Sequence, residues 1–396
     1  MILAALLLTA VLPAGAPGAG AFDSTSSTAA VLSSAAIVAA PATSTTVVAV
    51  PPPSRPPDWV KPLHGVHITG WAAGSPKTRR RLIRDIRNAG LNAAVIALKE
   101  YDGIMFVKDV PLARQVGAYS NAIPDLEACV RDFKAAGLYT IARIVLFKDN
   151  TLARRRPDLA VRTAGGGVWS NFNGVAWVDP YRREVWEYNL AIASRAAAAG
   201  FDEIQFDYVR FPSDGNVRRC RYSRPDHNDR TANQSLLAFL ALARRRLQPL
   251  GVRLSICVFG MTASDDSGMG IGQHITELAQ EMDFVSPMMY PSHYRKGNYG
   301  LKNPNRQPYQ TIAAGTRDAV ERMGAQAWKL RPYLQDFSLG FRYREPQVRA
   351  QILAAAKQGV TNWILWNAKN NYTWAALRHN NQPIYSVTAP AGRQVP

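Results

Sequence analysis

Residues 199–211 read Ala-Gly-Phe-Asp-Glu-Ile-Gln-Phe-Asp-Tyr-Val-Arg-Phe, and this stretch contains the repeating signal that decides the fold. Its Ala-Gly pair ends a run of helical periodicity over 180–200, where glycine is a common stop. A short segment follows over 202–211 in which apolar and polar residues alternate around Ile204 and Phe206, as expected of a strand. The stretch therefore indicates the junction between a helix and the next strand of an α/β protein.

The same junction recurs along the chain, with further glycine stops within 88–91, 135–138 and 358–360. The pattern predicts strands at 64–70, 92–99, 139–147, 202–211, 253–260, 283–290, 328–335 and 361–367. Helices are predicted after them at 77–90, 124–137, 180–200, 233–247, 272–281, 309–323, 346–359 and 373–377. Eight such units favour a (β/α)8 (TIM) barrel. A doubly wound sheet is less favoured, because residues 64–74 lack a G-x-G-x-x-G turn.

Composition divides the chain of 396 residues into four parts. Residues 1–21 hold an apolar run and small residues, as in a secretory signal peptide, although no Lys or Arg precedes the run. Residues 22–57 form a linker rich in Ser, Thr, Ala and Pro. The barrel is expected over 58–383, and a loose C-terminal tail over 384–396. This organisation predicts an exported protein, secreted or held at the cell envelope.

The chain is strongly basic, with a formal net charge of +18 and a pI near 10.1. This charge favours anionic partners such as acidic polysaccharide, cell-wall polymer or a membrane surface. No nucleic-acid partner is expected, because the Arg clusters fall on several different elements. Cys129, Cys220 and Cys257 show no metal-type spacing, so neither a metal nor a cofactor is predicted. A disulfide from Cys220 to either of the others stays open.

In barrels of this kind the active site lies at the carboxyl ends of the strands. Asp207 stands near the end of the fourth predicted strand, and alternation places it with Gln205 on the face toward the barrel axis. A carboxylate there needs a charged partner, which Lys99 or Arg210 could supply. Asp207 is therefore the first candidate for a nucleophile or general base.

Glycosidic cleavage needs a second carboxyl group, roughly 5–5.5 Å away for retention or 6.5–9.5 Å for inversion. Asp336, just after the seventh predicted strand, could face Asp207 across the barrel mouth as general acid, and Glu100 is the alternative. Other rim residues are expected to bind substrate, namely Lys99, Asp102, Asp149, Gln205, Tyr208, Arg210, Tyr290, His293, Gln335, Trp366 and Asn367. The loop Arg218–Arg224 could contact an acidic substrate.

Four segments of the chain resemble one bacterial family. They are Ala142–Asp149, Glu203–Pro212, Ser286–Tyr294 and Arg331–Phe337. Together, over about His64 to Tyr372, they resemble the glycoside hydrolase domain family DUF4015, which implies a glycosidase-like barrel.

Comparison with two other glycosidase types limits the chemistry. The fourth strand is similar to the D-x-x-D-x-D-x-E motif of chitinase-like barrels, but Val209 stands where their glutamic acid would be. Substrate-assisted chemistry is therefore not expected. An amylase-like barrel would have a Glu at the end of the fifth strand, and Phe259-Gly260 has none.

The predicted function is hydrolysis of an extracellular or cell-envelope polysaccharide by two-carboxylate acid/base chemistry. One alternative is a non-catalytic carbohydrate-binding barrel tethered at the cell envelope, in which any carboxyl pair would lie too far apart to act. The other alternative is a protein that binds nucleic acid or a phosphate polymer through its charge, and such a protein would need one continuous basic face.

Overall fold

The computed structural model describes residues 56–57, 60–379 and 382–384. Eight parallel strands close into a barrel in sequential order. They are β1 His64–Ile68, β2 Ala93–Lys99, β3 Tyr139–Val145, β4 Glu203–Asp207, β5 Arg253–Phe259, β6 Phe284–Met289, β7 Tyr333–Gln335 and β8 Trp363–Trp366. The predicted (β/α)8 barrel is confirmed.

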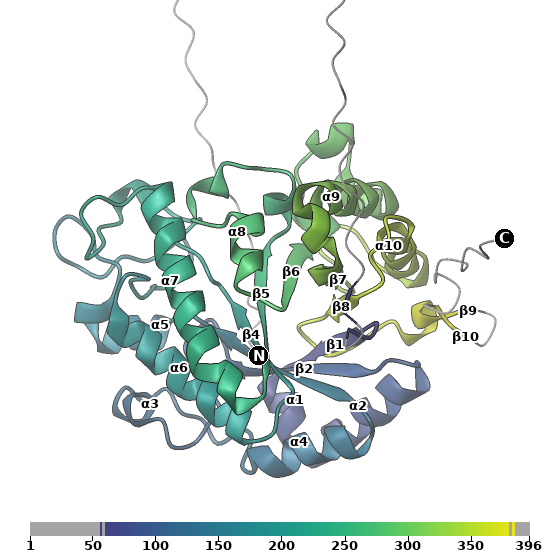
Figure 1. Ribbon diagram of the computed structural model, residues 1–396, viewed down its shortest axis with the longest axis horizontal. Coiled ribbons are helices and arrows are strands. Elements are labelled where there is room, and N and C mark those ends of the chain that lie inside the picture. Colours follow the sequence, from purple (N-terminus) through teal and green to yellow (C-terminus); the bar gives the residue numbers. More distant parts are fainter. Residues whose placement is uncertain (1–55, 58–59, 380–381, 385–396) are drawn as a thin grey trace, which may run out of the picture.

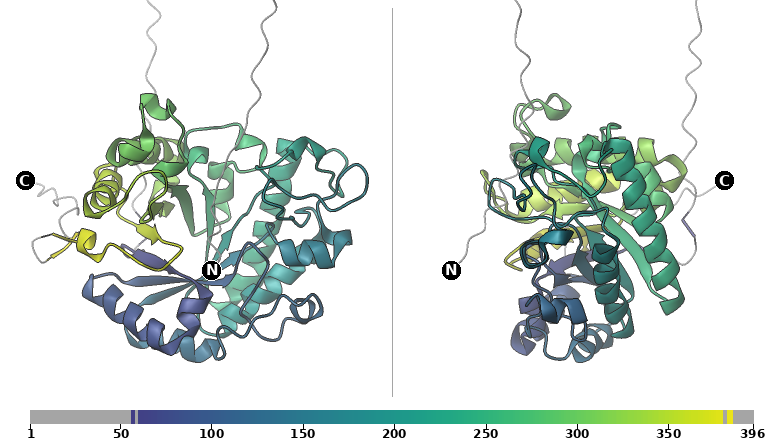
Figure 2. Two further views of the ribbon diagram at one scale, coloured as in Figure 1. Left: turned by 180° about the vertical axis from the view of Figure 1, so that it is seen from behind. Right: turned by 90° about the vertical axis from the view of Figure 1, so that its left-hand side faces the viewer.

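Helices surround the strands, as Figure 1 shows from one end and Figure 2 from behind and from the side. The longer ones are α2 Pro76–Asn88, α4 Leu126–Ala135, α6 Arg183–Ala198, α7 Asp229–Leu247, α9 Pro308–Met323 and α10 Glu345–Lys357. The short ones are α1 Gly70–Gly74, α3 Pro111–Gln115, α5 Asn150–Arg155 and α8 Ile275–Gln280. Of these, α1, α3 and α5 were not predicted, because each is a single turn or little more within a loop.

Each strand is shorter than its predicted range, and two strands differ from it the most. The fourth stops at Asp207 because Tyr208 has a φ of 52°, which turns the chain out of the extended conformation. The seventh begins at Tyr333, since Gly324–Lys329 forms a 3-10 helix. A short antiparallel pair, β9 Arg378–His379 with β10 Gln382–Pro383, follows the barrel.

The core has two layers, as alternation along buried strands requires. The larger layer lies between strands and helices, where Phe206 of β4 packs against Phe239 of α7 at 5.4 Å between ring centres. The smaller cluster includes Val95, Ile141 and Tyr333 from β2, β3 and β7. Polar residues of β4 face the same interior, and these residues form the site described below.

Several predictions concern parts of the chain that the structure does not describe. The predicted signal peptide at 1–21 lies outside the described residues, as do nearly all of the linker at 22–57 and of the tail at 384–396. Among the residues that are described, no helix is both long and apolar enough to span a bilayer. All three cysteines are free and buried, so neither disulfide left open by the sequence forms.

Candidate active site

Asp207 and Arg143 form a buried ion pair at the carboxyl end of the barrel. Arg143 Nε and Nη2 donate to Asp207 Oδ2 at 2.9 and 2.5 Å, and the Tyr208 amide donates to Oδ1 at 2.7 Å. The two side chains are only 4% and 3% exposed. A carboxylate so well shielded from solvent requires a close counter-charge, and Arg143 supplies it. The prediction that Lys99 or Arg210 pairs with Asp207 was therefore wrong.

Glu100 is the second carboxylate at this site. Arg143 Nη1 donates to Glu100 Oε2 at 3.3 Å, so one guanidinium contacts both acids. The two contact distances and the width of the guanidinium group limit the gap between the nearest carboxylate oxygens to about 8 Å. A separation up to that limit is compatible with the range, about 5–9.5 Å, that glycosidic cleavage uses.

A bulge in β2 directs Glu100 toward the barrel axis. Ala97 pairs with Arg143, but Lys99 pairs with the very next residue of β3, Ile144, so Leu98 is the extra residue. The extra residue reverses the alternation of faces beyond it. Lys99 therefore points to the helix layer, and Glu100 points inward to Arg143.

The environment of Glu100 suits a proton donor. Burial raises the pKa of Glu100, and the charges of Asp102 and Asp207 raise it further. Arg143 opposes this effect, by charge and by its hydrogen bond, without reversing it. The Glu100 side chain is 22% exposed, against 3% for Asp207, so it is the more accessible of the two acids.

Aromatic rings line the same end of the barrel. The Arg143 guanidinium lies 4.9 Å from the ring centre of Trp366, and His67 stacks on Trp366 at 3.8 Å between ring centres. Both ring nitrogens of His67 lack a hydrogen-bond partner among the described residues. Tyr290 is buried nearby, and the charge of Asp207 adds to the effect of burial in raising its pKa. Trp366 and Tyr290, both predicted binders, thus lie close to the carboxylates.

Gln205 lies below Asp207 in the barrel interior. Its Nε2 donates to Ser255 and Ser286 at 3.3 and 3.4 Å, and its Oε1 accepts from the Tyr333 hydroxyl at 2.6 Å. The predicted orientation of Gln205 and Asp207 toward the axis is confirmed. Gln205 is nevertheless completely buried, so its contacts support the interior of the barrel.

Lys99 and Asp149 form a separate ion pair behind the site. Their charged atoms lie 2.8 Å apart, and both side chains are completely buried. Lys99 also donates to Asn189 Oδ1 at 2.9 Å, and Asp149 caps α5 by accepting from the Leu152 amide at 2.8 Å. These contacts tie β2 to α5 and α6.

Arg210, beyond the end of β4, is buried among three rings. It lies over Trp177, Tyr208 and Phe259 at 4.8, 4.9 and 4.4 Å from the ring centres. Its Nη1 donates to the Phe211 carbonyl and to Ser213 Oγ, and its Nε has no partner among the described residues.

Asp336 is bound to the loop after β8. Its Oδ2 accepts from the Thr373 amide at 2.7 Å and its Oδ1 from the Thr373 hydroxyl at 2.6 Å. Burial raises the pKa of Asp336. No described contact joins Asp336 to Asp207 or Glu100, so its role as general acid stays a prediction without structural support.

The remaining predicted residues make contacts within and between the loops at the strand ends. Asp102 accepts from the Ile104 amide at 2.9 Å. Gln335 accepts from the Ser292 amide at 3.0 Å and donates to the Phe337 carbonyl at 2.9 Å. Asn367 accepts from the Lys369 amide at 2.8 Å. His293 is half-buried beside Tyr290, and burial lowers its pKa to about 4, so its imidazole is neutral near pH 7.

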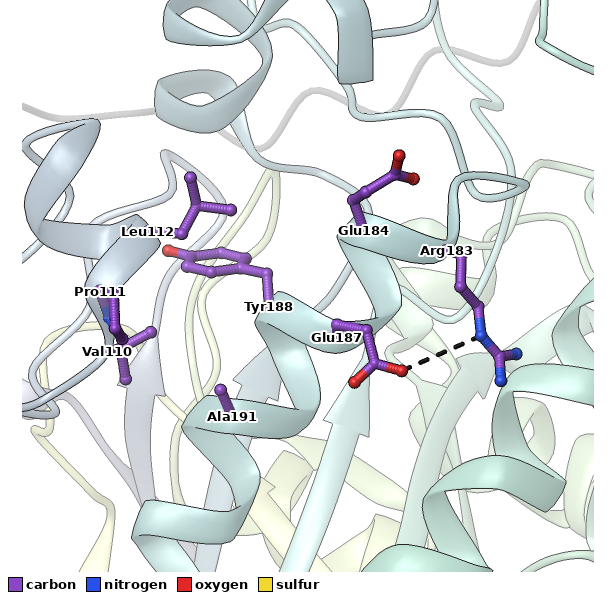
Figure 3. A pocket seen from close by; sticks show the side chains of 8 residues that line it. All are labelled: Val110, Pro111, Leu112, Arg183, Glu184, Glu187, Tyr188 and Ala191. Carbon is purple, nitrogen blue, oxygen red and sulfur yellow. Dashed lines mark ion pairs between the residues drawn. The ribbon is translucent and has the colours of Figure 1, made fainter.

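A cavity of about 600 Å³ lies away from these acids, between α3 and the first turns of α6. Figure 3 shows the Tyr188 ring extending from α6 toward Leu112 of α3. The charged groups in its wall include Arg183 and Glu187, which pair with each other at 3.9 Å. The lining is mostly apolar and contains neither Asp207 nor Glu100. The paired carboxylates, rather than this cavity, define the candidate active site.

Two charged residues close to the candidate site were not singled out from the sequence. Arg143 was detectable as the only charged side chain in the apolar run 139–147. Lys148 lies just beyond β3, among the rings of Tyr101, Trp177 and Tyr208. A lysine at a strand end carries no local sign of such surroundings. Within the described part of the chain, no three His, Cys, Asp or Glu side chains gather as a metal site requires.

Two solved structures share the fold at low sequence identity. The PgaB (BpsB) glycoside hydrolase domain from Bordetella bronchiseptica has a TM-score of 0.59 at 14% identity, covering 81% of this chain and 99% of that chain. The alpha-L-fucosidase isoenzyme 2 from Paenibacillus thiaminolyticus has a TM-score of 0.57 at 11% identity, covering 83% of this chain and 49% of that chain. These likenesses show the barrel fold.

Sequence similarity is higher to one further protein. A hypothetical protein from Ruminiclostridium thermocellum ATCC 27405 is 31% identical over 52% of this chain and 98% of that chain, with a TM-score of 0.45. Among curated proteins, none matches this chain. The DUF4015 family, described as "Putative glycosyl hydrolase domain", matches residues 65–372, which include Glu100, Arg143 and Asp207. The chain therefore belongs to the DUF4015 family of glycosyl hydrolase domains.

Proposed function

We propose that this glycosidase hydrolyses an extracellular or cell-envelope polysaccharide, with Asp207 and Glu100 as its two catalytic carboxyl groups. The observation that carries the proposal is the Arg143 guanidinium, which contacts both acids and limits their separation to about 8 Å. Export to the cell envelope is supported by the composition of residues 1–57.

The two acids would have different roles. Glu100, whose pKa is raised by burial, gives its proton to the glycosidic oxygen as the bond to the anomeric carbon breaks. Asp207 either attacks that carbon or takes a proton from the attacking water. Arg143 balances the charge that Glu100 acquires after its proton leaves. The water oxygen ends on the anomeric carbon of the product.

The test is release of reducing ends from a panel of bacterial and plant polysaccharides. Asp207→Asn is expected to lower kcat at least about 10³-fold, since general acid–base and nucleophilic groups contribute this much or more. Asp158→Asn is the matched control, because the Asp158 side chain is 56% exposed and pairs with Arg156 at the surface. Full activity of Asp207→Asn would remove Asp207 from the mechanism.

A second measurement separates the roles of the acids. Glu100→Gln is expected to lose much less activity on a dinitrophenyl glycoside than on a polysaccharide, because that leaving group needs no proton. Equal losses on both substrates would contradict the assignment of Glu100 as general acid. Selective binding of a polysaccharide without any cleavage would favour the carbohydrate-binding alternative.

A further inference from the structure

Lys148 carries an unusual cation at the mouth of the barrel. It follows β3 and is half-buried. Its ammonium nitrogen lies 5.3 Å from the ring centre of Tyr101, 5.9 Å from that of Trp177 and 5.2 Å from that of Tyr208. These rings come from the ends of β2 and β4 and from the loop before α6. Their faces attract the cation but accept no conventional hydrogen bond from it.

Among the described residues, Lys148 has neither a hydrogen bond nor an ion pair with a carboxylate. Three other buried cations of the barrel each have an acidic partner, whereas Arg210 is held by three rings, the Phe211 carbonyl and the Ser213 hydroxyl. Arg143 pairs with Asp207 and Glu100, Lys99 with Asp149, and Arg331 with Glu203, as given by their ion pairs. A cation withdrawn from water is costly unless a counter-charge meets it. Lys148 therefore keeps three N–H donors and one positive charge available at the mouth.

The acids near Lys148 do not neutralise it by contact. Asp207 is held by Arg143, and Asp214 accepts from Asn171 Nδ2. Both carboxylates act on Lys148 through space, while Arg210 repels it. None of them comes within ion-pair distance of the ammonium group, so an anion from outside the chain could fill the position.

We infer that Lys148 binds a carboxylate group of the sugar residue that lies beside Asp207, so the substrate class is a polysaccharide containing uronic acid. This inference rests on the proposed function and specifies its substrate. Asp207 ends β4 and Lys148 lies just beyond the neighbouring strand β3. Of the three rings around Lys148, Trp177 and Tyr208 are buried, and the half-buried ring of Tyr101 is the one on which a sugar can pack. One ammonium group matches one negative charge. A phosphate group would be expected to have several donors, such as Arg forks or successive backbone amides.

The experiment is calorimetric titration with trimers of galacturonate, glucuronate and mannuronate, each compared with its methyl ester. The ester removes the charge and keeps the sugar. At about 0.15 M salt, which screens the general basic charge of the chain, at least one acid is expected to bind about tenfold more tightly than its ester. Lys148→Met should remove that preference. Lys369→Met is the matched control, because Lys369 is an exposed lysine on the same rim, and it should keep the preference.

The pH dependence gives a second readout that does not need the methionine variant to fold. Burial lowers the pKa of Lys148 to about 8. The groups that face it are Tyr101, Trp177, Asp207, Tyr208, Arg210 and Asp214. Burial raises the pKa of both tyrosines, so neither gains charge before Lys148 loses its own. The preference of the wild type should fall between pH 7 and pH 9, whereas Lys148→Arg should keep it at pH 9.

Three outcomes would overturn the inference: no trimer preferred over its ester, a preference that survives in Lys148→Met, or one that does not change between pH 7 and pH 9. Cleavage is scored separately, by reducing ends. Selective binding of an acidic trimer without cleavage of any polymer would leave this site standing and refute the hydrolase proposal. Cleavage of neutral polymers with no preference for acidic trimers would support the hydrolase proposal and refute the Lys148 site.

Discussion

Replacing Arg143 by methionine removes the cation that both Asp207 and Glu100 contact. Methionine keeps much of the aliphatic stem, so the change is mainly one of charge and hydrogen bonding. In the variant, Asp207, whose side chain is 3% exposed in the wild type, keeps only the Tyr208 amide as a donor. Glu100 also loses its donor at the same time.

The expected loss of unfolding free energy at pH 8 is about 3–5 kcal/mol, the usual cost of leaving one partner of a buried pair alone. The contact of Arg143 with Trp366 contributes about 0.5–2 kcal/mol of this and is the smaller effect. Glu100 adds less than Asp207, because its partly exposed side chain can be solvated.

The loss should depend on pH, and the sign follows from linkage. Without Arg143, the pKa of Glu100 in the folded protein rises further above its value in the unfolded chain, because burial raises it and the cation no longer opposes this effect. Between pH 5 and pH 8 the folded variant then binds more protons than the unfolded chain, so its stability rises as the pH falls. The difference from the wild type should shrink by at least about 1.5 kcal/mol from pH 8 to pH 5.

The measurement is urea unfolding at pH 8 and pH 5, followed by tryptophan fluorescence. Arg84→Met is the matched control, because Arg84 is 65% exposed and pairs with Asp85 at the surface, where such pairs contribute about 0–1 kcal/mol. A loss below about 1 kcal/mol in Arg143→Met, or one that is equal at both pH values, would refute the reasoning.

Three other predictions concern Asp336, Glu100 and Arg331. Asp336→Asn should lower the unfolding free energy by about 1–2 kcal/mol by weakening its bonds to Thr373. It should leave kcat within about threefold; a loss of more than about 100-fold would return the general-acid role to Asp336. Because burial raises the pKa of Glu100, wild-type kcat should fall as the pH rises through that raised value. Glu100→Gln should lack this decline, and its persistence in a pH–rate profile would identify another acid. Arg331→Met should cost about 3–5 kcal/mol in urea unfolding, since Arg331 and Glu203 are both completely buried, and much of the loss should return in a double variant with Glu203→Met.

The sequence predicted the barrel well because its signals are local. Each strand and helix has its own hydrophobic period, and glycine marks the ends of several helices. The ends of elements were less predictable. The fourth strand stops at Asp207 because of the backbone angle of Tyr208, and no glycine, proline or asparagine within 202–211 signals that turn.

The site was predicted only in part, for the same reason. Strand alternation was enough to orient Asp207 and Gln205 toward the axis. The partner of Asp207 was missed because Arg143 lies 64 residues earlier in the chain and meets it only across neighbouring strands. Lys99 was given a role at the mouth, whereas the bulge in β2 turns it to the helix layer.

By itself, the sequence determined the barrel, the end of the barrel that carries the chemistry and the inward orientation of Asp207, since all three follow from periodicities along the chain. Only the tertiary structure decided that Arg143 joins Asp207 to Glu100 and that Asp336 binds Thr373 instead. The physical reason is that pairing between charges depends on which strands become neighbours and on their register. A single extra residue in β2 reverses the faces beyond it.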